Sequence, residues 1–329
     1  MISLVFGVAG CSGSAVPEPA PAPTPASTPT PTSPASNLRE IAPDATNAAI
    51  TATPAPHIAV NPVAGVAAQG RLLVMLPGTG ANPRAYRLIL QRAAANGVHA
   101  IGLAYPNPVT IGDLCGPAAT PACPGDVRTE IITGEDRSPL VSITPLNAIA
   151  GRLDALLAFL HNRYPDEGWG QYRHAGGPSW SRLRVAGHSQ GAGHAALMGK
   201  LYTLDRIAMF GGFSDAVNAV WPALPNLTPI SQIFGLAHAA DELVPLALIQ
   251  FNWNRMGLGA FGPPVNVDAG VPPFAGSRQF VTAAPANPTT PLNLVPLPLH
   301  SAMIVDVVTP LAADGSPALG PVWDIMLLR

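Results

Sequence analysis

The sequence predicts an α/β domain with a mostly parallel central sheet flanked by helices. Short apolar runs with strand character alternate with helical segments along the chain, which is the pattern that parallel sheets produce. The 329 residues are enough for a sizeable core. No apolar run reaches the roughly 18 residues that a transmembrane helix needs, so the sequence predicts no such helix.

Composition and charge narrow the classes of function. Charged residues make up 11% of the chain, the formal net charge is −2, and Lys200 is the only lysine. A nucleic-acid-binding protein normally carries a strongly basic surface, which this balance does not provide. We therefore expect no nucleic-acid partner and no polybasic membrane patch.

Residues 1–15 resemble the lipoprotein signal of bacteria. Val8-Ala9-Gly10-Cys11 follows a short apolar start, and signal peptidase cuts before the cysteine of such a lipobox, which then carries lipid. Met1-Ile2-Ser3 departs from the pattern because it lacks positive charge. We expect an exported protein that is anchored to a bacterial membrane or cell surface only through lipid at Cys11; an ordinary terminal cysteine is the alternative.

Residues 16–39 predict a linker, and residues 40–329 the globular domain. The linker consists almost wholly of Pro, Ala, Thr and Ser, which cannot bury a core and favour an extended polyproline-II tether.

The first half of the domain predicts two strands and two helices. An apolar strand at 71–76 stops at Pro77-Gly78-Thr79-Gly80, and helix 86–96 and strand 98–104 follow. A long irregular loop is expected to run to about residue 142. Thr144 and Pro145 then predict the start of a helix, whose apolar face includes Ile149 and Leu160.

The second half predicts further strands around one Ala-rich helix. The helix is expected at 191–202, and the strands at 183–187, 207–210, 233–236 and 279–282.

Cys115 and Cys123 lie eight positions apart in the expected loop. An exported protein would pair them in a disulfide, whereas a cytosolic protein would keep two free thiols. Two cysteines without a nearby histidine pair are too few for a zinc site. We expect the disulfide, together with export.

The motif that most clearly indicates catalysis is Gly187-His188-Ser189-Gln190-Gly191. It joins the end of an apolar strand to the start of a helix, which is where a nucleophile elbow must lie. Side chains two positions before and after the serine would collide with the neighbouring strand and helix. The helix N-terminus also favours a developing oxyanion. Ser189 is therefore the candidate nucleophile.

This motif and its setting resemble the α/β-hydrolase superfamily, over nearly all of residues 55–329. The continuation Ala192-Gly193-His194 looks most like secreted bacterial esterases and lipase-like hydrolases. The resemblance implies an α/β-hydrolase fold and a triad in the order serine, acid, histidine. The short stretch between the strands at 207–210 and 233–236 implies that no large cap domain is inserted there.

The triad order selects His300, because it is the only histidine beyond the candidate acids. Asp241 is the preferred acid, since Asp241-Glu242-Leu243-Val244-Pro245 resembles the acid turn of the family. Asp215 is the alternative acid, at a position that some lipases use.

An oxyanion hole needs two backbone N–H groups. The resemblance assigns one to Gln190 and the other to the turn after residue 76, where Pro77-Gly78 replaces the more common His-Gly pair. We expect Thr79 to supply the second N–H, with Gly80 as an alternative. Gly78 and Gly80 lack the third glycine of a dinucleotide motif, because position 83 is proline. No metal-ligand spacing occurs, so no cofactor or metal is expected.

These residues predict a serine hydrolase that cleaves carboxylic esters through an acyl-enzyme. A small-molecule or lipid ester is the expected substrate. A serine peptidase of the same fold and a non-catalytic surface lipoprotein remain the alternatives.

Overall fold

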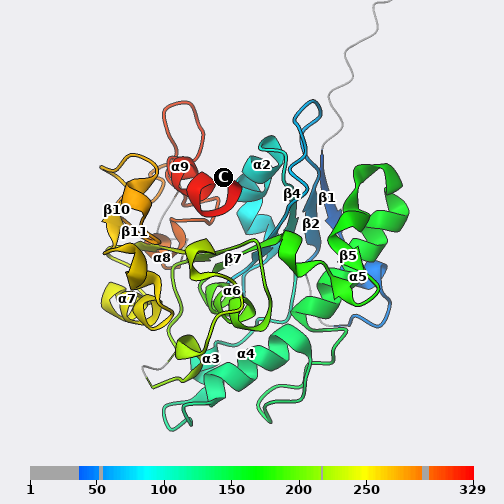
Figure 1. Ribbon diagram of the computed structural model, residues 1–329, viewed down its shortest axis with the longest axis horizontal. Helices are drawn as coiled ribbons and strands as arrows, with labels where there is room; N and C mark the ends of the chain where they lie inside the picture. The colour runs from blue at the N-terminus through cyan, green and yellow to red at the C-terminus, as the bar shows by residue number, and fades with distance from the viewer. Residues whose placement is uncertain (1–36, 52–54, 216–217, 291–295) are drawn as a thin grey trace, which may run out of the picture. The chain divides into compact units, whose positions relative to one another are not determined.

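The computed structural model describes residues 37–51, 55–215, 218–290 and 296–329. A nine-stranded sheet forms the centre of this part of the chain (Figure 1). Its strands in spatial order are β1 (Leu38–Ile41), β2 (His57–Val60), β4 (His99–Gly102), β3 (Leu72–Leu76), β7 (Leu183–His188), β8 (Arg206–Phe210), β9 (Ile233–His238), β11 (Gln279–Thr282) and β10 (Val265–Asn266).

All pairs from β4 to β10 are parallel, and only β1–β2 and β2–β4 are antiparallel. The predicted α/β class with a mostly parallel sheet is therefore confirmed. Parallel neighbours need crossover connections, and helices supply them here. The helices are α1 (Pro43–Thr46), α2 (Arg87–Ala95), α3 (Ile111–Cys115), α4 (Cys123–Thr133), α5 (Ile149–Arg163), α6 (Gln190–Leu201), α7 (Leu246–Arg255), α8 (Pro298–Ser301) and α9 (Gly320–Trp323).

Two apolar cores lie on the two faces of the sheet. Strand β3 shows the reason: Leu72, Val74 and Leu76 belong to one core, and Leu73 and Met75 belong to the other. The first core includes apolar residues of α4, α5 and α6, and the second includes those of α2, α9 and the π-helical turn at Asp324–Leu328. Both faces of the sheet are thus covered by packed side chains.

The expected irregular loop up to residue 142 is wrong, because it contains α3 and α4. The buried residues of α4 include Val127 and Ile131, which pack into the first core. The helical spacing is hard to see because Cys123-Pro124-Gly125 begins the helix.

The helix expected from Thr144 begins at Ile149 instead. Thr144 opens only a single turn, in which Asn147 and Ala148 donate to its carbonyl oxygen, and Ala148 is extended. Gly151 lies so close to Pro145 that a Cβ atom would be 2.0 Å from the Pro145 oxygen. The turn therefore packs back against α5 rather than extending it.

The amino-terminal boundary also differs slightly. Strand β1 begins at Leu38, two residues before the expected start of the domain, and pairs with β2. The expected lipidation site at Cys11, with residues 1–15 and most of the Pro-rich linker, lies outside the described residues. None of the described helices is long and apolar enough to cross a membrane.

Lys200, the single lysine, is buried in α6. Its Nζ donates to the Leu224 carbonyl at 2.6 Å and to Oδ1 of Asn226 at 2.9 Å. Burial lowers the pKa of Lys200 to about 8.

Candidate active site

Ser189 lies in a strained turn between β7 and α6. Its backbone has φ 55° and ψ −118°, in a region that non-glycine residues rarely occupy. A Cβ atom on Gly187 would lie 2.0 Å from the Gly191 oxygen, and one on Gly191 would lie 2.2 Å from the Leu76 oxygen. The motif therefore needs glycine on both sides, as the sequence indicated.

A cavity of about 710 Å³ opens at the carboxyl ends of β3 and β7. Ser189 and His300 both line it, together with Thr79 and Gln190. Apolar side chains form much of the remaining wall, among them Ile111, Phe213, Leu243, Val244, Leu297 and Val305. The cavity thus combines a candidate nucleophile with room for an apolar group.

His300 and Asp241 form a buried pair. Nδ1 of His300 lies 2.7 Å from Oδ2 of Asp241, and the two side chains are 3% and 0% exposed. Burial pulls the pKa of Asp241 upward, but the hydrogen bond and charge of His300 outweigh it, with help from the amides of Val244 and Leu243, and the pKa is lowered. Asp241 is therefore ionised and holds the ring in the tautomer with its proton on Nδ1.

The other ring nitrogen of His300 is free to accept a proton. Nε2 is buried and has no hydrogen-bond partner among the described residues. The structure thus places Ser189 and His300 in the lining of one cavity, with Asp241 in contact with His300 and no hydrogen bond between Ser189 and His300. Such contacts often tighten only when substrate binds.

Glu242 is a site residue that sequence reasoning missed. Its carboxylate accepts the backbone N–H groups of Leu299 at 2.8 Å and of His300 at 2.7 Å. It therefore caps the first turn of α8 and fixes the backbone of His300. The adjacent carboxylates in Asp241-Glu242 are the only signal that could have indicated this role.

Asp215 lines the same cavity but pairs with Arg128 rather than with a histidine. Nε of Arg128 donates to Oδ2 of Asp215 at 2.8 Å, Nη2 donates to Oδ1, and the Trp221 indole donates to Oδ2 at 2.6 Å. Both charged side chains are 2% exposed. Nη1 of Arg128 also donates to the Gln190 carbonyl at 3.1 Å, so this ion pair supports the start of α6.

The turn after β3 leaves one amide free. Gly80 donates to the Asn107 carbonyl at 3.0 Å and Gly78 donates to the Tyr86 hydroxyl at 3.2 Å, whereas the Thr79 N–H has no acceptor among the described residues. The Gln190 N–H is the first amide of α6 and has no acceptor within the helix. The side chains of Thr79 and Gln190 hydrogen-bond at 2.8 Å, which brings the two residues together. Thr79, rather than Gly80, thus has an amide available.

A chain of buried hydrogen bonds runs from this turn to His300. Gly78 donates to the Tyr86 hydroxyl, which lies 3.0 Å from Nδ1 of His188, and Nε2 of His188 lies 3.1 Å from the His300 carbonyl oxygen. The bonds are all satisfied when Tyr86 donates to Nδ1 and Nε2 carries the proton. Burial lowers the pKa of His188 to about 3, so this neutral form is the one present at ordinary pH.

Cys115 and Cys123 join the end of α3 to the start of α4. Their sulfur atoms lie 2.02 Å apart, at bonding distance. Residues 110–113, just before Cys115, line the cavity. The link therefore restrains a segment that forms one wall of the candidate site.

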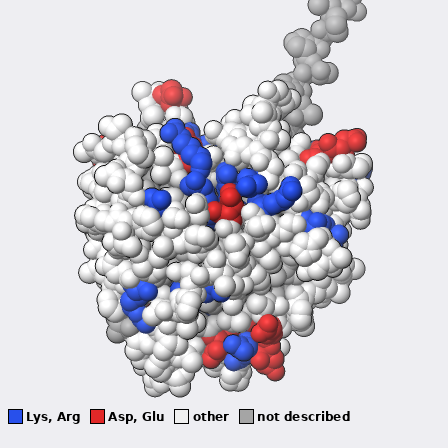
Figure 2. Space-filling model, viewed as in Figure 1, with Lys and Arg blue, Asp and Glu red and all other residues white. Residues whose placement is uncertain are grey.

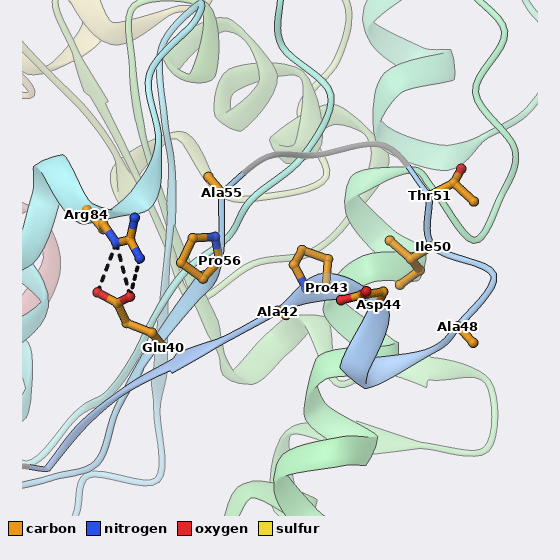
Figure 3. A pocket seen from close by; sticks show the side chains of 10 residues that line it. All are labelled: Glu40, Ala42, Pro43, Asp44, Ala48, Ile50, Thr51, Ala55, Pro56 and Arg84. Carbon is orange, nitrogen blue, oxygen red and sulfur yellow. Dashed lines mark hydrogen bonds and ion pairs between the residues drawn. The ribbon is translucent and has the colours of Figure 1, made fainter.

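A second hollow, of about 610 Å³, lies beside β1 and α1 (Figure 3). Its charged residues include Glu40, Asp44 and Arg84. The hydrogen bond from Arg84 keeps the pKa of Glu40 below its usual value, and Arg87 also donates to it. Glu40 is therefore a poor base, and this hollow is a weaker candidate for chemistry.

Within the described ranges, no group of three His, Cys, Asp or Glu residues could hold a metal ion. Neither a protein-family model nor a curated protein matches this chain.

Proposed function

We propose that the protein is a serine hydrolase of the α/β-hydrolase fold that cleaves carboxylic esters. The observation that carries the proposal is the buried Asp241–His300 pair, whose free Nε2 belongs to the cavity wall that also holds the strained Ser189. A histidine oriented by a carboxylate, with a partly exposed serine on an elbow in the same cavity, is the arrangement needed for nucleophilic acyl transfer.

The proposed reaction has two halves. Nε2 of His300 takes the proton of Ser189 as its oxygen attacks the ester carbonyl, while Asp241 stabilises the imidazolium. The N–H groups of Thr79 and Gln190 donate to the oxyanion of the tetrahedral intermediate. His300 then protonates the leaving alcohol, and the acyl-enzyme is released by water that His300 deprotonates.

We further propose that the protein is exported and lipid-anchored at Cys11. The pairing of Cys115 with Cys123 supports this, because such bonds persist in oxidising compartments.

The assignment of Ser189 is tested with a fluorophosphonate probe, which reacts with activated serines. We expect the wild-type protein to be labelled at Ser189 and Ser189→Ala to remain unlabelled. Ser301, which also lines the cavity, provides a matched control, and Ser301→Ala should be labelled like the wild type. Labelling that survives Ser189→Ala would overturn the assignment.

The choice of an ester is tested with p-nitrophenyl esters of graded chain length and the corresponding anilides. We expect ester turnover that depends on Ser189 and little anilide turnover, because an alkoxide leaves with less assistance than an amine. Faster anilide cleavage would point to a peptidase instead.

A further inference from the structure

Three arginines converge on a hollow at the amino ends of the parallel strands. Arg71 directly precedes β3, Arg184 is the second residue of β7, and Arg206 is the first residue of β8. All three line a hollow of about 440 Å³, which is also lined by Arg329 and by the polar side chains of Ser181, Thr203 and Gln232. The candidate active site lies at the opposite, carboxyl ends of these strands.

The hollow carries excess positive charge. Asp205 is its only acidic lining residue, and it pairs with Nε of Arg184 at 2.6 Å and with Nε of Arg71 at 3.2 Å. Several partly buried arginines elsewhere in the described chain each pair with a carboxylate, as in Arg39–Glu167, Arg92–Asp324 and Arg173–Asp154, whereas Arg278 donates to backbone carbonyls. On the face shown in Figure 2, basic side chains gather in the middle around a small acidic group.

The charge of Arg206 is compensated in part, by the nearby charge of Asp205 and by the Phe234 ring, whose centroid lies 5.5 Å from its Cζ atom. Arg206 stands directly opposite Arg184 in the register of β7 and β8, and like charges in that position repel. No carboxylate among the described residues forms an ion pair with Arg206. Burial lowers the pKa of Arg206, and the charges of Arg184 and Arg278 add to this effect.

The arginines also have a structural role, but it leaves donors unused. Nη1 of Arg206 donates to the Ile325 carbonyl and Nη1 of Arg184 to the Leu327 carbonyl, both at 2.8 Å, so both hold the final turn of the chain. Nε and Nη2 of Arg206 have no acceptor among the described residues, and neither atom is buried. These two atoms form the edge of a guanidinium that binds phosphate through two parallel hydrogen bonds.

We propose that this hollow binds a phosphate-type anion through Arg206 and Arg71, at a site separate from the candidate active site. An anion there would accept hydrogen bonds from the unused N–H groups of Arg206. Its negative charge would also offset the repulsion between Arg184 and Arg206. A free phosphate and the phosphate of a lipid headgroup share this chemistry. The site does not depend on the proposed hydrolase function.

Thermal unfolding of the full chain in inorganic phosphate tests the site. We expect phosphate to raise the melting temperature in a saturable manner, beyond the effect of sodium chloride at equal ionic strength. Gln232→Glu places a carboxylate in the hollow without removing an arginine contact, and it should raise the Kd for phosphate by about tenfold or more. Gln91→Glu, the same change at an exposed position of α2, should bind phosphate like the wild type.

Arg71→Gln is the second variant, because Arg71 is the most exposed of the ion-paired arginines in the hollow and its loss should disturb the fold least. It should also weaken phosphate binding. The absence of a phosphate effect beyond that of sodium chloride would overturn the proposal, and so would equal phosphate affinity in wild type and Gln232→Glu. Competition by glycerophosphoglycerol, the deacylated headgroup of phosphatidylglycerol, would identify a lipid source, whereas phosphate binding without such competition would identify the free anion.

Discussion

The two aspartates beside the cavity differ in what they contact, and each contact indicates what the residue does. Asp241 holds a histidine whose other nitrogen is free, whereas Asp215 neutralises a buried arginine. In the proposed reaction, the first contact would stabilise the positive charge that forms on His300, whereas the second is part of the folded framework.

Asp241→Asn should lower kcat by about 10³–10⁴-fold, because asparagine cannot stabilise the imidazolium and favours the wrong tautomer. Asp215→Asn should instead lower the free energy of unfolding by about 3–5 kcal/mol, because it leaves the Arg128 charge buried and uncompensated. Ester kinetics and urea denaturation of both variants separate the two effects. If Asp215→Asn had the larger effect on kcat, the acid would have to be reassigned.

Tyr86→Phe removes the hydroxyl that links Gly78 to His188. We expect kcat to fall by about tenfold with KM changed by less than about threefold, since the oxyanion turn loses an anchor and the binding walls remain. Tyr172→Phe is the matched control, because the Tyr172 hydroxyl makes a similar buried contact with Nδ1 of His99 at 2.8 Å, outside the cavity lining. Equal kcat losses in the two variants would show that the chain from Gly78 to His300 has no special role.

Sequence reasoning reached the residues that a local motif or chain order identifies, namely Ser189 and the candidates His300 and Asp241. It preferred Thr79 and kept Gly80 as the alternative, because the distinction depends on which N–H group donates to the Asn107 carbonyl, a contact that forms only in the folded chain. It missed Glu242 and Tyr86 for the same reason. Their partners lie in other elements, and nothing in the local pattern marks them.

At the scale of elements, the strands were easier to predict than the helices between them. Strands β3, β7, β8 and β9 are buried on both faces and appear as continuous apolar runs. Strands β1 and β2 were missed, because β1 is only partly buried at the edge of the sheet and Pro-rich sequence surrounds both. Helix α4 was missed because its buried residues include polar ones, Arg128 and Glu130, which pair with Asp215 and with backbone N–H groups of the following loop.

The disulfide between Cys115 and Cys123, which joins α3 to α4, should contribute about 2–3 kcal/mol to the free energy of unfolding, since it closes a short loop. Replacing both Cys115 and Cys123 with serine should lower stability by that amount and raise KM, because residues 110–113 of the cavity wall are then less restrained. Urea denaturation and ester kinetics measure the two effects.

Mass spectrometry of non-reduced peptides from the exported protein tests the pairing itself. Two free thiols in that material would contradict both the disulfide and the proposed export.

For the whole molecule, buried histidines make stability depend on pH. Burial lowers the pKa of His57 and His188 to about 3 and that of His194 well below its usual value. In the unfolded chain each of these histidines binds a proton near pH 6.5. The free energy of unfolding is therefore highest above that pH and decreases as the pH falls toward 3. Each histidine contributes about 1.4 kcal/mol per pH unit in this range. Between about pH 6 and 4, Asp306 has the opposite effect on the free energy of unfolding and offsets that of one histidine, because burial raises the pKa of Asp306 to about 6.

The urea midpoint should therefore fall steeply between pH 6.5 and 4.5. His57→Asn keeps an acceptor for the Ala104 N–H and removes the titrating group, so its slope against pH should be smaller. His174→Asn is the control at an exposed position, where Nδ1 accepts the Gly176 N–H in the same way, and it should keep the wild-type slope. A midpoint that does not change with pH would contradict the buried neutral histidines.

The burial of Lys200 has a practical consequence for handling the protein. With its one lysine largely buried beside a hollow of about 390 Å³ and hydrogen-bonded to Leu224 and Asn226, the folded domain offers dyes, cross-linkers and activated resins only one, poorly accessible side-chain amine. Oriented immobilisation through a side-chain amine therefore needs a lysine introduced at an exposed position such as Gln91. Conversely, because burial slows the reaction of Lys200 with acylating reagents, its modification in a labelling pulse should become faster when the domain opens.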